Sequence, residues 1–78
     1  MLLVQVNLDT LPLRPRIDLA RFADVHETLV KLSEDPHSDV RLALIGNKHV
    51  SDKIITTLSK DECEVVRKAA LEYLNLTD

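Results

Sequence analysis

Residues 32–43 read LSEDPHSDVRLA, and residues 58–69 read LSKDECEVVRKA. The two stretches align without a gap, and half of their positions are identical. The identical pairs are Leu32 and Leu58, Ser33 and Ser59, Asp35 and Asp61, Val40 and Val66, Arg41 and Arg67, and Ala43 and Ala69. A weaker match continues upstream at the same offset, where residues 25–35 align with residues 51–61. Residue 32 aligns with residue 58, so the repeat recurs every 26 residues. A repeat of this length predicts one pair of helices per unit.

Apolar residues in both repeats recur at the spacing of one face of an α-helix. The later stripe is Val66, Ala69, Ala70 and Tyr73, and the earlier one is Val40, Ala43 and Leu44. Ile54, Ile55 and Leu58 form the apolar face of a helix between them. These i, i+3, i+4 and i+7 patterns predict amphipathic helices. We expect five helices, near residues 17–23, 26–33, 37–46, 51–59 and 62–74.

Start and stop signals lie at the expected ends of these helices. Asp35 and Pro36 suit a capping residue followed by a first helical turn. Gly46 and Asn47 suit a left-handed residue after the helix ends. Ser51 is the expected cap of the next helix.

The first residues follow a different pattern. Val4, Val6 and Leu8 alternate with polar residues, as in a strand, and Pro12 and Pro15 favour extended chain. We therefore predict an extended, β-capable arm over residues 1–16 and a helical domain over residues 17–78. The arm either caps the helices or pairs with a partner or a second copy. Its candidate protein-binding residues are Leu2, Val4, Val6, Leu8, Leu11 and Leu13.

Composition agrees with an all-α protein that has an aliphatic core. Phe22 and Tyr73 are the only aromatic residues, and Gly46 is the only glycine. A β-sandwich or barrel needs several turn glycines. Seventy-eight residues make at most one domain. The single cysteine and the lack of an apolar run of about 20 residues predict a cytoplasmic protein without a signal peptide or membrane anchor.

The repeat resembles the leucine-rich variant repeat, a relative of the HEAT and armadillo helical repeats. The resemblance rests on Asp35-Pro36, on Val-Arg-x-Ala at residues 40–43 and 66–69, on Asn47, and on Leu-x-x-Leu-Ser-x-Asp at residues 29–35. It covers about residues 25–74. The second unit departs from the pattern, because Glu62 stands where a proline is preferred. The resemblance implies short paired helices in a right-handed stack, with binding or scaffolding roles and no chemistry.

No motif predicts catalysis, a cofactor or a metal. The chain lacks a glycine-rich phosphate loop, a nucleophile elbow and an HExxH motif. His26, His37, His49 and Cys63 are not spaced as zinc ligands. Cys63 stands near a helix start, which favours a thiolate, but the neighbouring carboxylates oppose one. We therefore expect an unreactive cysteine and no enzymatic activity.

The basic residues allow two interpretations. Arg41 and Arg67 occupy the same repeat position, which favours bridges to carboxylates such as Asp35, Asp39 or Asp61. In the alternative, basic residues on one face grip a nucleic-acid backbone, although the net charge is −3. The candidates for that role are Arg14, Arg16, Arg21, Arg41, Lys48, Lys53, Arg67 and Lys68.

The sequence thus predicts a small interaction module, an adaptor or inhibitor that binds a larger protein through its helices, its arm or both. Nucleic-acid binding is the first alternative. A structural homodimer assembled through the arm is the second. A membrane partner is not expected.

Overall fold

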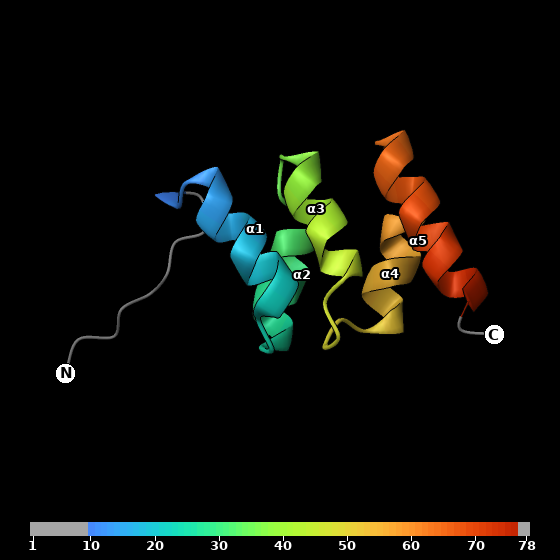
Figure 1. The fold of residues 1–78 in the computed structure, drawn as a ribbon, viewed down its shortest axis with the longest axis horizontal. Helices are drawn as coiled ribbons and strands as arrows, with labels where there is room; N and C mark the ends of the chain where they lie inside the picture. The colour runs from blue at the N-terminus through green and yellow to red at the C-terminus, as the bar shows by residue number, and fades with distance from the viewer. Residues whose placement is uncertain (1–9, 77–78) are drawn as a thin grey trace.

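The computed structural model describes residues 10–76, which form five α-helices and contain no strand. The helices are α1 (Leu13–Phe22), α2 (His26–Ser33), α3 (Ser38–Ile45), α4 (Asp52–Leu58) and α5 (Glu64–Leu76). Figure 1 shows α1, α3 and α5 following one another across the molecule, with α2 and α4 set against them. Contacts join α1 to α3, α3 to α5, and α2 to α4. The predicted all-α class is confirmed.

The first helix begins earlier than the sequence patterns predict. α1 starts at Leu13, so the prediction of extended chain through residue 16 is wrong for residues 13–16. Pro12 is the residue before the helix, and Pro15 lies within its first turn. The first backbone N–H groups of a helix have no partner within it, so a proline costs no hydrogen bond there. Residues 1–9 of the predicted arm lie outside the described residues.

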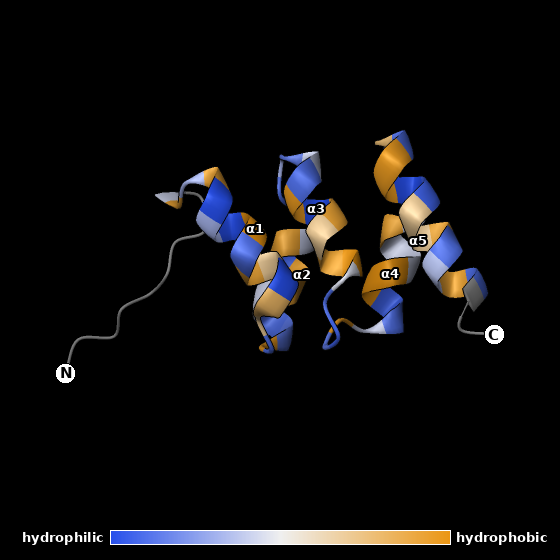
Figure 2. Cartoon of the chain, viewed as in Figure 1, coloured by the Kyte–Doolittle hydropathy of each residue, from blue (hydrophilic) through white to orange (hydrophobic). Residues whose placement is uncertain are grey.

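An aliphatic core joins all five helices. Figure 2 shows hydrophobic and hydrophilic residues alternating around the helices. The buried apolar residues are Ala20, Leu29, Leu32, Val40, Leu44, Val50, Ile54, Ile55, Leu58, Val66 and Ala70. They include most members of the predicted stripes, while Ala43, Ala69 and Tyr73 are half-buried. Burying one large aliphatic side chain contributes about 1.5–3 kcal/mol, so this core is the main source of stability.

One predicted helix-end signal is confirmed, and another is wrong. Ser51 caps α4 as expected, because its Oγ accepts a hydrogen bond from the Ile54 N–H at 3.3 Å. Gly46 follows α3, but its φ of −85° and ψ of 0° are right-handed, so the predicted left-handed residue is wrong. The helix instead tightens at its end, where Gly46 and Asn47 donate to carbonyls three residues back.

Asn47 ties the end of α3 to the end of α1. Its buried side-chain amide donates to the carbonyls of Ala20 and Ala23, both at 2.9 Å. Its Oδ1 accepts from the His49 backbone N–H at 2.7 Å. One side chain therefore satisfies two carbonyls at the C-terminal end of α1 and shapes the loop that leads to α4.

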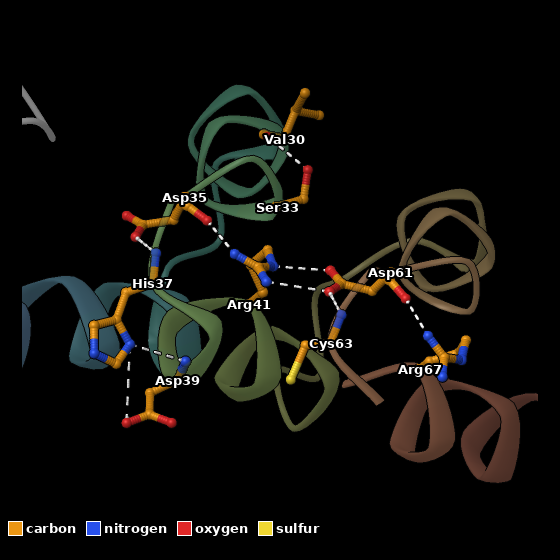
Figure 3. Close-up of polar contacts among 9 residues, drawn as sticks. All are labelled: Val30, Ser33, Asp35, His37, Asp39, Arg41, Asp61, Cys63 and Arg67. Carbon is orange, nitrogen blue, oxygen red and sulfur yellow. Dashed lines mark hydrogen bonds and ion pairs between the residues drawn. The ribbon is translucent and has the colours of Figure 1, made fainter. Parts of the chain in front are cut away.

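The repeated Asp and Arg residues make the same local contacts in both repeats. Figure 3 shows Asp35 and Asp61 in the loops before α3 and α5. Each carboxylate accepts a backbone N–H two residues on, at 2.9 Å in the first loop and 2.8 Å in the second. Arg41 donates to the Asp35 carbonyl at 2.6 Å, and Arg67 donates to the Asp61 carbonyl at 2.8 Å. Each arginine thus stabilises the loop of its own repeat by a hydrogen bond.

The same residues also join one repeat to the next. Arg41 binds the Asp61 carboxylate with two nitrogens, Nε at 2.8 Å and Nη2 at 3.1 Å. Arg16 on α1 binds the Asp35 carboxylate through Nη1, at 2.8 and 3.0 Å. We call Arg16, Asp35, Arg41, Asp61 and Arg67 the arginine–aspartate ladder. The predicted bridge from Arg41 to a carboxylate is confirmed.

We predict that Arg41→Met destabilises the protein by about 3–5 kcal/mol, because Asp61 then keeps a poorly exposed charge without its partner. The Arg41 and Asp61 side chains are only 9% and 7% exposed. Urea unfolding measures the change. Arg14→Met, on an exposed arginine of the same chain, should change stability by less than about 0.5 kcal/mol. Equal effects of the two substitutions would contradict the ladder's role.

The ladder also predicts how stability depends on pH. Burial alone raises the pKa of the Asp61 carboxyl, but hydrogen bonds from Arg41 and the Cys63 N–H outweigh it and hold that pKa below its ordinary value. A lowered folded-state pKa stabilises the fold above the unfolded pKa, and this contribution is lost as the pH falls through the folded value. The free energy of unfolding should therefore fall below about pH 4.

Asp61→Asn should flatten that fall, because the amide carries no ionisable proton in this pH range. Urea titrations at a series of acidic pH values measure the effect. Glu72→Gln, on an exposed residue of α5, is the matched control and should keep the wild-type slope. An unchanged slope in Asp61→Asn would show that Asp61 does not couple folding to protonation.

Candidate protein-binding groove

An open groove runs between α1 and α3. Its lining residues are Ile17, Arg21, Phe22, Asp39, Leu42, Ala43 and Gly46, and we call it the α1–α3 groove. Ile17, Leu42 and Ala43 are half-buried and pack against the core, so they form an apolar floor on a rigid support. The groove exists because α1 and α3 present these residues at their facing sides, where residues three or four positions apart on a helix are neighbours.

Phe22 stands exposed at the α1 side of this groove. It is the only phenylalanine of the chain, and 72% of its surface is exposed. The Arg21 guanidinium carbon lies 5.6 Å from the centroid of the Phe22 ring, within the range of a cation–π contact. Such a contact favours one ring orientation, so the Phe22 side chain loses less conformational entropy when a partner binds.

Besides the apolar Leu42 and Ala43, the α3 side of the groove has one charged residue and one glycine. Asp39 lies exposed in the first turn of α3, and its carboxylate is 3.9 Å from Nδ1 of His37. Gly46 lies at the other end of α3 and has no side chain to narrow the groove. A Cβ added there would meet only the Ala43 carbonyl oxygen, at an ordinary 3.6 Å. The groove therefore offers one apolar floor, one exposed aromatic ring and charges of both signs.

The predicted arm residues are described only in part. Leu2, Val4, Val6 and Leu8 lie outside the described residues. Leu11 is half-buried before α1. Leu13 is the first residue of α1 and packs against the core. Leu13 thus belongs to the helical domain, and the arm's binding role stays a prediction.

Several of the basic residues predicted for nucleic-acid binding already have partners within the protein. Arg16 and Arg41 are held by Asp35 and Asp61. Lys68 pairs with Glu64 at 3.0 Å, one turn away on α5. Arg67 donates to a backbone carbonyl within the ladder. The remaining candidates, Arg14, Arg21, Lys48 and Lys53, are exposed.

The pKa of the Cys63 thiol differs from what the sequence predicts. Backbone N–H groups of Val66 and Val65, at the start of α5, lower the pKa of the thiol, and a hydrogen bond with Ser38 adds to this. Burial and the Asp61 charge act in the opposite direction and do not prevail. The expectation that the neighbouring carboxylates dominate is therefore wrong, because the N–H groups at the start of α5 lower the pKa of the thiol by more than the Asp61 charge raises it.

Among residues 10–76, no cluster of three or more potential ligand side chains is placed to hold a metal ion. In the same part of the chain, no helix has the length and apolar character required to cross a bilayer.

Sequence reasoning missed most of the groove. Of its lining residues, only Arg21 was among the candidates, and for nucleic acid rather than protein. Phe22 carried the one usable signal, because a lone phenylalanine at the end of a short helix lies outside the apolar stripes. The pairing of α1 with α3 was not readable before the helices were placed, because α2 separates them in the sequence.

Comparisons with family models, curated proteins and solved structures found no match to this chain.

The lowered pKa of Cys63 predicts that its alkylation by iodoacetamide reaches half-maximal rate at a lower pH in the folded protein than in urea. The reason is that α5 backbone N–H groups stabilise the thiolate only when the helix is formed. Cys63 is the only cysteine, so the reaction reports on one site. Ser38→Ala should move the midpoint upward. A folded-state midpoint equal to or above that in urea would contradict the assignment.

Proposed function

We propose that this chain is a protein-interaction module that binds a segment of another protein in the α1–α3 groove. The observation that carries the proposal is Phe22, a lone and largely exposed phenylalanine beside an apolar floor. Aromatic and arginine side chains are enriched where proteins bind one another, and they often dominate the binding energy. Arg21 and Phe22 supply both in adjacent positions.

The chemistry of the groove suggests what the partner presents. An aliphatic side chain fits the floor formed by Ile17, Leu42 and Ala43. A carboxylate of the partner suits Arg21, and a basic group suits Asp39, on opposite walls. The partner segment therefore combines an apolar anchor with charged neighbours. The role of the groove is binding without turnover.

We further propose that the five helices are a short right-handed helical-repeat stack of the leucine-rich variant or HEAT kind. The repeated contacts support this, because Asp35 with Arg41 and Asp61 with Arg67 have the same geometry in the two repeats. In such stacks each unit packs on its neighbours, and the stacking creates extended binding surfaces. The α1–α3 groove lies between two such helices.

Protein binding is favoured over nucleic-acid binding because several of the basic residues already form ion pairs. Three of the eight candidates, Arg16, Arg41 and Lys68, already pair with carboxylates. Phosphate binding requires several cations that are free to replace counterions. Of the four exposed candidates that remain, Arg14, Arg21, Lys48 and Lys53, only Arg21 lines the groove.

The test is quantitative affinity capture from the host's extract with wild type and two matched variants. Phe22→Ser removes the exposed ring of the groove. Val25→Ser removes a neighbouring side chain that is 57% exposed but does not line the groove. Recovery of a true partner should fall at least about tenfold with Phe22→Ser, because removing an aromatic anchor costs roughly 2 kcal/mol or more. It should be retained with Val25→Ser.

Gly46→Ala adds an independent check. The new methyl group meets only the Ala43 carbonyl at an ordinary distance, so the variant should fold normally. It reduces the free space of the groove and should weaken capture of the same partner. If all variants recover the same proteins in the same amounts, the groove is not the binding site.

A further inference from the structure

The two helices that form the α1–α3 groove run in the same direction. Arg16, near the start of α1, binds Asp35, which lies just before α3. At the other end, the Asn47 side chain after α3 donates to the carbonyls of Ala20 and Ala23 at the end of α1. Figure 1 shows the same parallel arrangement. The groove therefore has one end at the two helix starts and the other at the two helix ends.

The charged side chains of the groove lie at its opposite ends. Asp39 is the second residue of α3, and Arg21 is the last residue but one of α1. Nδ1 of His37 accepts the Asp39 backbone N–H at 3.1 Å, so this nitrogen carries no proton and the imidazole does not neutralise the carboxylate. Arg21 lies over the Phe22 ring, and no carboxylate within residues 10–76 pairs with it. The groove is thus negative at the helix starts and positive at the helix ends.

The shape of the groove suits an α-helix. Its apolar floor, Ile17, Leu42 and Ala43, belongs to two parallel helices of ten and eight residues. Helices of this length make a trough about 12–15 Å long, and a row of apolar side chains on another helix packs into such a trough. An extended segment would bring backbone N–H and C=O groups that α1 and α3 cannot pair, because their own groups are bonded within each helix.

α2 is an example within the chain of a helix that packs on both α1 and α3. It contacts both of them and does not line the groove. Because it joins the end of α1 to the start of α3, it runs in the opposite direction to both. It has an acidic residue, Glu27, in its first turn and a basic residue, Lys31, in its last, while Leu29 and Leu32 are buried. A helix with this direction and this order of charges is therefore compatible with the α1 and α3 pair.

We propose that the α1–α3 groove binds an amphipathic helix of the partner protein that lies antiparallel to α1 and α3, with acidic residues in its first turn and basic residues in its last. Its first turn then lies beside Arg21, and its last turn lies beside Asp39. The positive N-terminal end of the bound helix meets the negative C-terminal ends of α1 and α3, so the helix dipoles favour the same direction. This inference rests on the proposed function of the groove and adds the kind of segment and its direction.

Two synthetic peptides of identical composition test the proposal. Each has about 15 residues and one row of leucines, and each is stapled so that circular dichroism shows both to be helical. The acid-first peptide has glutamates in its first turn and lysines in its last, and the base-first peptide has them exchanged. NMR titration of the full chain measures both affinities. The acid-first peptide should bind at least about tenfold more tightly, because only it places opposite charges together at both ends of the groove.

The direction of binding has its own measurement. A nitroxide at the N-terminal end of the acid-first peptide should broaden the amide signal of Gly46, and one at its C-terminal end should broaden that of Asp39. Gly46 is the only glycine of the chain and lies just after α3. The opposite pattern, equal affinities of the two peptides, or no binding of either peptide would overturn the proposal.

Exchanging the two charges of the groove should reverse the preference between the peptides. The variant with both Arg21→Glu and Asp39→Lys should bind the base-first peptide more tightly, which a difference in peptide helicity cannot cause. The matched control combines Arg14→Glu, on an exposed arginine of α1, with Asp52→Lys, on an exposed aspartate in the first turn of α4. Neither residue lines the groove, so this variant should keep the wild-type preference. A charge-exchanged variant that still prefers the acid-first peptide would overturn the proposal.

The peptide experiments and the capture experiment can fail separately. If Phe22→Ser abolishes capture of a partner but the peptides do not bind or bind equally, the groove binds protein and the directional helix is wrong. If Phe22→Ser leaves capture unchanged, the proposed function fails, and this inference fails with it.

Discussion

The bridge from Arg41 to Asp61 is the contact on which the arrangement of the helices depends. One guanidinium bonds the carbonyl of the loop before its own helix and the carboxylate of the loop before α5. The carboxylate in turn accepts the Cys63 backbone N–H just before α5 begins. The start of α3 is thereby tied to the start of α5. The aliphatic core supplies the driving force, while these directional bonds select one packing among several that the core alone would tolerate.

The α1–α3 groove is a consequence of that arrangement. Asn47 holds the end of α1 against the end of α3, and Arg16 with Asp35 holds their beginnings. The two helices are therefore tied at both ends, and the space between their outer sides is left open. A groove between tied helices changes little in shape when a partner enters, so the ordering cost of binding is small. The Phe22 ring at its edge supplies a large contact area for such a partner to bury.

Much of the helix placement was predictable because the sequence repeats. The constant offset between the repeats placed α2 to α5 within a few residues, and the repeated position of Arg41 predicted its bridge to a carboxylate. The same prediction for Arg67 was wrong within residues 10–76, where Arg67 donates to the Asp61 carbonyl instead. The prediction failed where a residue's role depends on its surroundings. Pro15 was expected to favour extended chain, yet it lies in the first turn of α1. Gly46 was taken as left-handed, yet the chain turns in right-handed geometry while Asn47 satisfies carbonyls of α1. The Cys63 thiol responds to helix N–H groups more than to its charged neighbours.

The sequence by itself determined that this protein is helical, that its core is aliphatic, and that its units repeat, because spacing and composition are local properties of the chain. Only the tertiary structure decided which carboxylate each arginine binds, that α1 and α3 enclose a groove beside Phe22, and that Arg67 has no carboxylate partner among the described residues. These outcomes depend on contacts between residues that are far apart in the sequence. Such contacts are set by how the helices pack, and no local pattern encodes them.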